Sequence, residues 1–298
     1  MNTQPPVYNI PAGLPFADTL AAGILTETAG DPLKLAQMRV FLPTRRACRV
    51  LRESFLRLTA GKPLLLPRMQ PIGDIHDDEP AMLESLRLDE DILGAIAPAM
   101  PPLQRQILLA RTIMAAPELG APEPEQAMGL AAALARLLDQ VHTEGKDIAS
   151  LQHIVPGDEI HWQVTVKFLR VLSETWPTIL AAEGMIDAAD RRNRLMRALA
   201  ATWRTNPPQG RVIVAGTTGS IPATADLLKV IASLPQGAVV LPGLDQGMDG
   251  ESWDVLDDNH PQATLRNLLQ HLDVPREAVK LWPAVTDDHH TPRRWLAA

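Results

Sequence analysis

Short runs of consecutive apolar residues are the first regular feature of this sequence. Four of them are rich in β-prone side chains and end at turn residues: "VYNI" (7–10), "MRVFLP" (38–43), "RVIVAG" (211–216) and "GAVVLPG" (237–243). Apolar residues occupy successive positions in these runs instead of alternating with polar ones. That pattern is typical of strands in a parallel sheet whose two faces are both covered.

Helical spacing follows the first three runs. It predicts helices over Phe16–Thr28, Arg45–Leu58 and Pro222–Ser233. Pro222 suits the first turn of the third helix, and Ser220 is a suitable N-cap for the same helix. Alternation of strand and helix predicts an α/β fold with a parallel sheet.

The middle of the chain has a different pattern. From about Glu79 to Arg204 it shows helical spacing and no convincing strand, and "PPLQRQILLARTIMAA" places Leu103, Ile107, Leu108 and Met114 along one face. Asp187 is a good cap for a helix over the residues that follow it. We therefore expect a discontinuous α/β domain formed by residues 1–78 and 205–298, with an all-helical insertion subdomain at residues 79–204.

Composition narrows the class of protein. The 298 residues are 46% hydrophobic and 21% charged, which is ordinary for a soluble globular protein. The net charge of −7 argues against an overall basic surface but leaves room for a local basic groove. A single cysteine, Cys48, excludes an intramolecular disulfide and any cluster that needs several thiolates. No apolar run reaches the roughly 20 residues needed to span a bilayer, and "MNTQPPVYNI" does not resemble a secretion signal, so we expect a cytoplasmic protein.

The first strand, turn and helix have the layout of a phosphate-binding loop without its chemistry. Such a loop uses glycine amides, a lysine and a hydroxyl residue to hold phosphates and Mg²⁺. The turn Pro11–Pro15 contains one glycine and no lysine, and Pro15 lacks an N–H. Each lost charge-assisted hydrogen bond is worth roughly 1.5–3 kcal/mol. The turn is therefore predicted to connect a strand to a helix and not to bind ATP.

A second glycine-bearing turn follows the third strand. It consists of Gly216, Thr217, Thr218, Gly219 and Ser220, directly before a predicted helix N-terminus, where anions are favoured. The G-x-x-G spacing matches neither a phosphate loop nor a dinucleotide fingerprint. Contact with a phosphate or a nucleic-acid backbone and an ordinary turn with a cap both remain open.

The segment "FLPTRRACRVLRESFLRL" (41–58) concentrates positive charge in an acidic protein. Thr44 can cap the predicted helix, and the segment carries five arginines: Arg45, Arg46, Arg49, Arg52 and Arg57. Arginine beside a helix N-terminus suits the phosphates of a nucleic acid. The alternative is a solvated helix face whose arginines pair with Glu53.

No catalytic group or metal site is predicted. The segment "GDIHDDEP" (73–80) gathers His76, Asp77, Asp78 and Glu79, but consecutive residues rarely converge on one ion. The segment "DQGMDG" (245–250) has Leu256 where a calcium loop needs glutamate. Ser54 and Ser220 lack a G-x-S-x-G setting.

Four segments of the chain resemble a known family. They are "FLPTRRACRVLRESFLR", "LLPRMQPIGD", "GTTGSIPATADLLKVIASLPQGAVVLPGLD" and "HPQATLRNLLQHL". They are similar to AddB subunits of the alphaproteobacterial type, which belong to AddAB helicase–nucleases. The resemblance extends over nearly the whole chain and is most specific between Gly216 and Asp245.

The resemblance implies a role in recombinational repair of DNA double-strand breaks. AddB subunits carry a superfamily I helicase-like N-terminal region that has lost its ATPase motifs in several lineages. The fold expected here is therefore a degenerate P-loop NTPase-like domain that uses no cofactor. The family's nuclease domain and iron–sulfur cysteines lie further along a longer chain and are not carried over to these residues.

The same resemblance suggests where DNA binds. Thr44, Arg45 and Arg46 follow the second strand, at the position where superfamily I helicases contact single-stranded DNA, and Arg49 continues this face of the helix. Residues 216–220 form a weaker second candidate. The implied partners are an AddA-type helicase–nuclease subunit and DNA in its single-stranded form. Two other hypotheses stay open, a stand-alone α/β enzyme that uses a nucleotide or phosphate at residues 216–220 and a protein-interaction module.

Overall fold

The computed structural model describes residues 6–72, 90–116, 122–146 and 171–285. The chain divides into two compact units, each described here by itself. The sheet unit comprises Met1–Ser85, Ala200–Ser220 and Thr224–Ala298, and the helical unit comprises Leu86–Leu199 and Ile221–Ala223. The expected domain boundary at residues 78 and 79, the acidic segment 73–80 and the tail from residue 286 lie outside the described residues.

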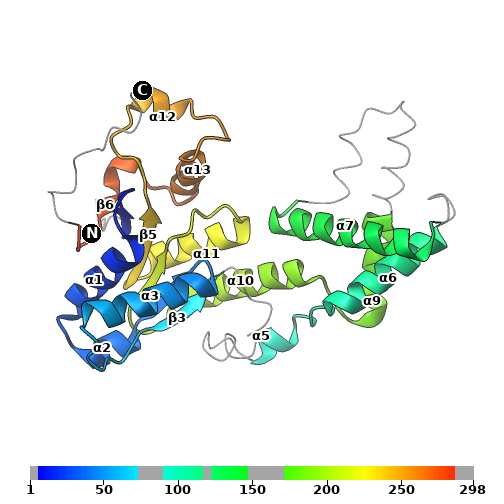
Figure 1. The fold of residues 1–298 in the computed structure, drawn as a ribbon, viewed down its shortest axis with the longest axis horizontal. Coiled ribbons are helices and arrows are strands. Elements are labelled where there is room, and N and C mark those ends of the chain that lie inside the picture. Colours follow the sequence, from blue (N-terminus) through cyan, green and yellow to red (C-terminus); the bar gives the residue numbers. More distant parts are fainter. Residues whose placement is uncertain (1–5, 73–89, 117–121, 147–170, 286–298) are drawn as a thin grey trace. The chain divides into compact units, whose positions relative to one another are not determined.

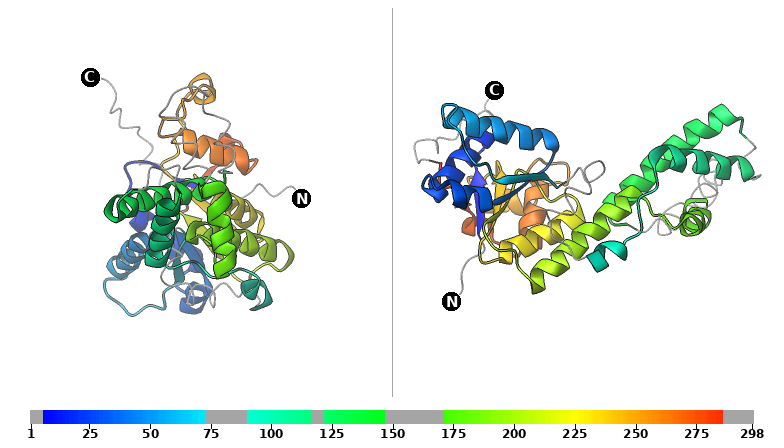
Figure 2. Two further views of the ribbon diagram at one scale, coloured as in Figure 1. Left: turned by 90° about the vertical axis from the view of Figure 1, so that its right-hand side faces the viewer. Right: turned by 90° about the horizontal axis from the view of Figure 1, so that it is seen from below.

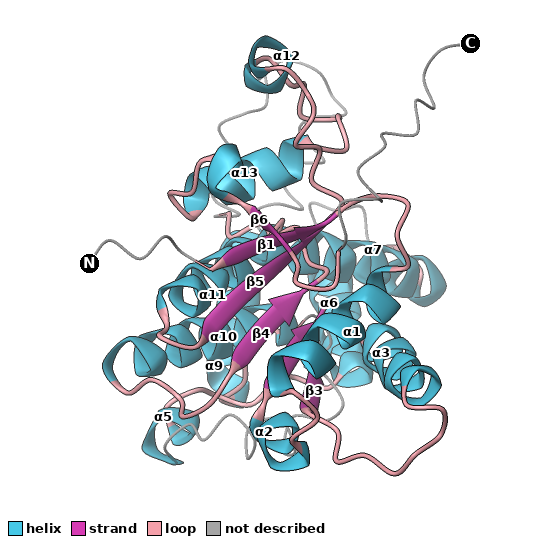
Figure 3. Ribbon diagram, turned by 90° about the vertical axis from the view of Figure 1, so that its left-hand side faces the viewer, coloured by secondary structure: helices cyan, strands magenta, loops and turns pink. Residues whose placement is uncertain are grey.

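The sheet unit is built on six parallel strands in the order β3-β2-β4-β5-β1-β6 (Figure 3). Four of them confirm the predicted strands: β1 (Val7–Ile10), β2 (Arg39–Leu42), β4 (Val212–Ala215) and β5 (Gly237–Pro242). The sequence pattern missed the two edge strands, which are β3 (Arg68–Pro71) and β6 (Lys280–Leu281). The α/β class and the parallel sheet are thus confirmed.

Helices cover both faces of this sheet. Helices α1 (Phe16–Thr28) and α3 (Arg45–Leu58) have the predicted bounds, and they pack beside each other on one face (Figure 1). Helix α11 (Pro222–Ser233) and the end of α10 (Ala188–Thr205) lie on the other face, where Phe41 meets Trp203 at a ring-centre distance of 5.8 Å. Right-handed crossovers explain this division, because β1, β2 and β3 progress along the sheet in one direction and β4 and β5 in the other.

One hydrophobic core of the sheet unit lies between the sheet and the α1–α3 pair. Its buried side chains come from β1, β2, β4 and β5 and from both helices, and they are joined by Trp282, which is fully buried after β6. Within its described residues, this unit also contains α2 (Pro32–Gln37), α12 (Gly250–Asp254), α13 (Ala263–His271) and the 3₁₀ turn η4 (Arg276–Ala278).

The helical unit contains α5 (Glu90–Gly94), α6 (Pro102–Ala115), α7 (Pro124–Thr143), the π-helical turn η3 (Val171–Thr175), α9 (Trp176–Glu183) and the first part of α10. Helices α6 and α7 lie side by side (Figure 2). Their shared core includes Leu109 and Ile113 of α6 and Ala127 and Ala131 of α7. The alanines let the two helix backbones approach each other closely.

The predicted apolar face of α6 is wrong for three of its four residues, and only Leu108 packs against the core of the helical unit. Leu103, Ile107 and Met114 are exposed to 65%, 42% and 38%, although the spacing assigned them to the core. The face that is buried instead carries Arg105 among its apolar residues.

Arg105 is buried together with Asp187, a carboxylate of the helical unit whose charge it neutralises. Asp187 is 1% exposed, and its Oδ1 lies 2.7 Å from Arg105 Nε. Its Oδ2 lies 3.2 Å from His142 Nε2 and accepts a hydrogen bond of 3.1 Å from Trp176 Nε1. Helix α10 begins directly after Asp187, as expected. The side chain of Asp187 contacts residues of three other helices: Arg105 of α6, His142 of α7 and Trp176 of α9. Asp139 accepts a further bond of 2.8 Å from Arg105 Nη1.

The charge of Asp187 is maintained by these contacts. Burial raises its pKa, but the hydrogen bonds from His142 and Trp176 and the positive charge of Arg105 together hold the pKa below its ordinary value. The network therefore stabilises the helical unit while the carboxylate is ionised.

Candidate functional site

The carboxyl ends of the strands bring the candidate segments to one edge of the sheet. Because all strands are parallel, the loops after β1, β2, β4 and β5 leave from this edge. Gly216 shows how closely they meet: a Cβ atom there would lie 3.1 Å from Phe16 Cε1 and 3.7 Å from Pro43 Cδ. A Cβ atom on Gly243 would lie 3.4 Å from that of Ala12. We call this region the carboxyl edge.

The turn between β1 and α1 presents apolar side chains at the carboxyl edge. Leu14 and Phe16 pack against the core, and the ring of Phe16 contacts Gly216. Leu14 N–H donates to Pro11 O at 3.4 Å, and Pro15, which precedes α1, makes no side-chain cap. The strand–turn–helix layout is present, with hydrophobic groups where a phosphate loop has polar ones.

The turn between β2 and α3 exposes the predicted arginines. Thr44 caps the helix, as expected, by accepting a hydrogen bond of 3.1 Å from Ala47 N–H. Cys48, Leu51 and Phe55 face the core at helical spacing, which places the polar face outward. Thr44 and the following arginines are exposed: Arg45, Arg46 and Arg49.

The electrostatics of this helix start are unfavourable for the helix alone. The first turn of α3 has no acidic residue and carries two arginines at the positive end of the helix dipole. Each cation so placed costs up to about 1 kcal/mol, and an anion bound beside it would offset that cost. The arrangement favours an anionic ligand.

Arg57 is also exposed, but it lies in the last turn of α3 and its charge is paired. It forms an ion pair with Asp18 of α1 and donates to Ser54 Oγ at 3.1 Å. Hydrogen bonds from Ser54 and Arg57 hold the pKa of Asp18 below its ordinary value. Arg57, which is one of the two arginines suggested as partners of Glu53, thus pairs with a neighbouring helix.

The loop Gly216–Ser220 lies at the end of β4, beside β2. Gly216 and Gly219 adopt left-handed φ angles of +75° and +64°, and a Cβ on Gly219 would lie 2.6 Å from Leu268 Cδ1 of α13. The N–H of Gly216 donates to Val240 O at 3.0 Å, and that of Gly219 donates to Thr217 Oγ1 at 3.3 Å. These two amides are therefore engaged within the protein. Helix α11 begins at Pro222, so Ser220 precedes it by two residues and not by one, as a cap would.

The two candidate segments start from neighbouring strands. Phe41 of β2 pairs with Val214 of β4, so Thr44, Arg45 and Arg46 emerge beside residues 216–220. Arg49 lies one turn further along α3. The helices after these strands, α3 and α11, pack on opposite faces, which makes β2 and β4 a topological switch point. Sequence reasoning missed the residues that shape this edge, Phe16, Gly243 and Leu268.

Two further classes of site are absent from the described residues. No group of three or more His, Cys, Asp or Glu side chains that could hold a metal ion occurs within 6–72, 90–116, 122–146 and 171–285. In the same ranges, every helix is too short or too polar to cross a bilayer.

Comparisons with models of protein families and with curated proteins find no match. The class of protein that the fold defines is an α/β protein with a six-stranded parallel sheet.

Proposed function

We propose that this chain is the ATPase-inactive, helicase-like part of an AddB-type subunit and that its carboxyl edge binds single-stranded DNA during double-strand break repair. The observation that carries the proposal is the exposed positive charge of Arg45, Arg46 and Arg49 at the start of α3. It occurs at a topological switch point, where open α/β sheets commonly bind ligands.

The chemistry of this helix start suits a sugar–phosphate backbone. Arginine offers several N–H donors in one plane, which matches phosphate oxygens, and the helix N-terminus adds amide dipoles directed at the same anion. The residues assigned to this contact are Thr44, Arg45, Arg46 and Arg49. Gly216, Thr217, Thr218, Gly219 and Ser220 are assigned a weaker backbone contact on the adjacent strand end.

The turn between β1 and α1 supports a role without ATP turnover. Leu14, Pro15 and Phe16 occupy the region that a phosphate loop uses for its lysine and amides. In the proposed complex, an AddA-type partner supplies ATP hydrolysis, and this chain contributes DNA contact and subunit docking without a cofactor.

The two other hypotheses have less support. An enzyme that binds phosphate at residues 216–220 needs backbone donors, but the amides of Gly216 and Gly219 already bond within the protein. A pure interaction module does not account for the concentration of exposed arginines at the start of α3.

Titration with two ligands separates the three hypotheses. The full chain is titrated with ATP–Mg²⁺ and with a fluorescent single-stranded oligonucleotide, the latter at two salt concentrations. We expect DNA binding that weakens with salt and no ATP binding. ATP affinity would contradict the proposal in favour of an enzyme, and binding of neither ligand would favour an interaction module.

A further inference from the structure

The segment from Asp245 to Glu277 carries most of the negative charge of this chain. It contains eight acidic residues and two arginines, so its net charge is −6, against −7 for the whole sequence. Helices α12 and α13 and the start of η4 belong to it and lie together at one end of the sheet unit (Figure 3). We call this segment the acidic lobe. Such a concentration of one sign of charge attracts a partner of the opposite sign.

The acidic lobe contains a pocket of about 480 Å³, which is formed by α12, α13 and η4. Its lining combines two kinds of group, which are apolar side chains from Trp253, Leu269, Val274 and Pro275 and carboxylates from Asp254, Asp273 and Glu277. Leu269 and Val274 are buried, whereas Trp253 is half-buried and Pro275 is exposed. An apolar wall beside carboxylates suits a long side chain with an apolar stem and a cationic end.

Two arginines also line this pocket, but both are engaged within the protein. Arg266 Nη1 donates hydrogen bonds to Leu256 O at 2.9 Å and to Asp254 O at 3.4 Å. The guanidinium of Arg276 lies 4.8 Å from the centre of the Trp253 ring, in a cation–π contact. The arginine side chains are only 13% and 11% exposed, so a ligand would meet little of their charge.

Two of the lining carboxylates are accessible to a ligand. The side chain of Glu277 is 77% exposed, and its Oε1 lies 3.5 Å from Arg276 Nε. Asp254 is exposed at the end of α12, and within the described part of the chain it forms no ion pair. Asp273 differs, because it is paired with Lys229 of α11 at 2.6 Å. The pocket therefore offers an uncompensated negative charge beside its apolar wall.

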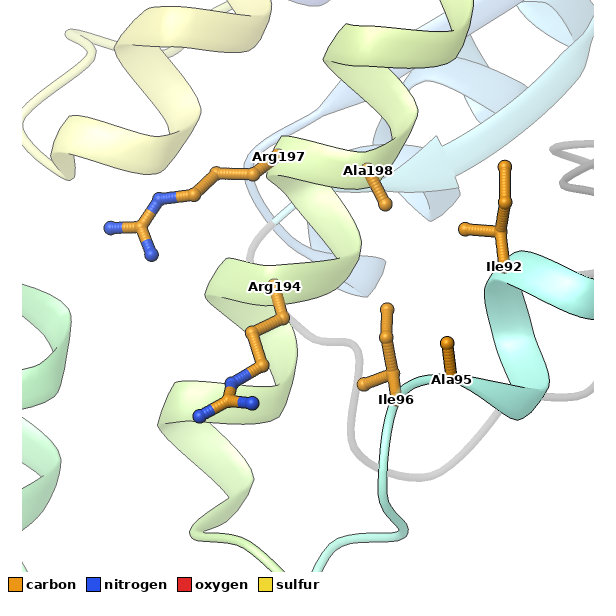
Figure 4. A pocket seen from close by; sticks show the side chains of 6 residues that line it. All are labelled: Ile92, Ala95, Ile96, Arg194, Arg197 and Ala198. Carbon is orange, nitrogen blue, oxygen red and sulfur yellow. The ribbon is translucent and has the colours of Figure 1, made fainter.

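A pocket of similar volume in the helical unit lacks this pattern. It lies between α10 and α5 and is lined almost only by apolar atoms. Arg194 at its edge is paired with Asp190 at 2.8 Å, and Figure 4 shows the head group of Arg197 directed away from Ile92 and Ile96. Of these two pockets, only the one in the acidic lobe has a charge that indicates the chemistry of its occupant.

We propose that the pocket of the acidic lobe binds a lysine or arginine side chain from a basic segment of a partner protein. The stem of that side chain packs against Trp253 and Pro275, and its charged end pairs with Asp254 and Glu277. A nucleic acid fits less well, because the carboxylates of the lobe repel its phosphates. The proposal concerns the acidic lobe alone and does not depend on DNA binding at the carboxyl edge.

Selection from a peptide library tests the proposal. The probe is a displayed library of random 12-residue peptides, selected on the full chain in about 0.1 M salt, where charges further apart than about 10 Å are largely screened. We expect enriched peptides with a lysine or arginine beside aliphatic or aromatic residues. Asp254→Asn combined with Glu277→Gln should bind the most enriched peptide about tenfold more weakly, as measured by fluorescence anisotropy, because two ion pairs are lost.

A double-mutant cycle separates pairing in the pocket from general attraction to the lobe. Replacement of the basic residue of the peptide by glutamine should weaken binding to the unchanged protein by the same factor. On the variant that lacks the carboxylates of Asp254 and Glu277, the same replacement should change the affinity by less than about twofold. Equal losses on both proteins would contradict the proposal.

A matched variant controls for the charge of the lobe. Glu251→Gln combined with Asp257→Asn removes the same charge at exposed positions that do not line the pocket, and the affinity should fall by less than about twofold. The proposal fails if no peptide is enriched, if the enriched peptides lack lysine and arginine, or if this control loses as much affinity as the pocket variant.

Two further measurements test other occupants of the pocket. Weaker binding of a single-stranded oligonucleotide to the variant with Asp254→Asn and Glu277→Gln would assign the pocket to nucleic acid and overturn the proposal. Tighter peptide binding after Arg293→Ala combined with Arg294→Ala would assign the pocket to a basic segment of this chain itself, and would likewise overturn it.

Discussion

At the scale of single residues, Gly216 joins the loops of the carboxyl edge. Its left-handed φ of +75° disfavours any side chain, and a Cβ would lie 3.1 Å from the Phe16 ring. Two separate penalties therefore apply to Gly216→Ala, one from the backbone and one from the contact with Phe16.

Gly13 offers a matched comparison for this position. It has a φ of +92°, and a Cβ added there would have nothing within 4 Å, so Gly13→Ala incurs the backbone penalty alone, about 1–2 kcal/mol. We expect Gly216→Ala to lower the free energy of unfolding by clearly more, as measured by urea denaturation. Equal losses would mean that the loops after β1 and β4 do not meet.

In the helical unit, Asp187 is the single residue whose substitution should affect stability most clearly. Asp187→Asn removes the counterion of buried Arg105 and should cost about 3 kcal/mol in the free energy of unfolding, because a buried charge is left partly uncompensated. Asp190→Asn removes a surface pair with Arg194 and should cost less than about 1 kcal/mol. Urea denaturation of both variants measures the difference, and similar losses would contradict the network.

Acid should weaken the same network. Because the pKa of Asp187 is lower in the folded protein than its ordinary value of 3.8, its contribution is present above that pH and is lost as the pH falls through the folded value. Hydrogen-exchange protection factors of amides in α6 and α10, which compare the observed rate with the intrinsic rate at the same pH, should fall on acidification in the unchanged protein and change less in Asp187→Asn. An identical response in both would show that other carboxylates determine the acid sensitivity.

At the scale of elements, the sequence predicted those parts whose pattern is local. The bounds of α1, α3 and α11 follow from apolar spacing and from start signals such as Thr44 and Pro222, and β1, β2, β4 and β5 are continuous apolar runs. Strand β3 escaped prediction because it begins with arginine and ends with proline, and β6 because it has two residues. An edge strand has a neighbouring strand on one side only, so fewer of its side chains are buried and its sequence needs fewer apolar residues.

The orientation of α6 was not predictable from local spacing. Leu103 and Ile107 are strongly hydrophobic, yet the buried face contains Arg105, whose partner Asp187 lies 82 positions away in the sequence. Close packing against the alanines of α7 also favours this face. The candidate site could likewise be predicted only in part. The arginines of α3 can be read from the sequence, but the contacts of Phe16 with Gly216 and of Leu268 with Gly219 depend on the order of strands in the sheet.

Substitutions on α6 test this orientation. Leu103→Glu and Ile107→Glu should each change the free energy of unfolding by less than about 0.5 kcal/mol, because both side chains are exposed. Leu109→Ala should cost about 2–5 kcal/mol, because Leu109 is fully buried. Urea denaturation distinguishes the two outcomes, and a large loss from Leu103→Glu would restore the face that the spacing predicted.

At the scale of the whole molecule, the sheet explains how distant segments meet. Strands β2 and β4 are separated by about 170 positions in the sequence but are neighbours in the sheet, so the arginines of α3 emerge beside the loop after β4. The central claim of the proposed function is that this edge binds DNA phosphates through Arg45 and Arg46.

The salt dependence of DNA binding measures that claim most directly. The slope of log K against log salt for a single-stranded oligonucleotide reports the number of phosphates contacted, at about 0.7 per phosphate. Arg45→Ala combined with Arg46→Ala should weaken binding and reduce the slope by about 1.4 if each arginine contacts one phosphate. Lys62→Ala combined with Arg68→Ala is the control, because it removes the same charge from exposed positions before and at the start of β3. These positions lie at the amino end of the strand, away from the carboxyl edge, so the slope should stay unchanged. An unchanged slope in the α3 variant, or an equal reduction in the control, would contradict the account.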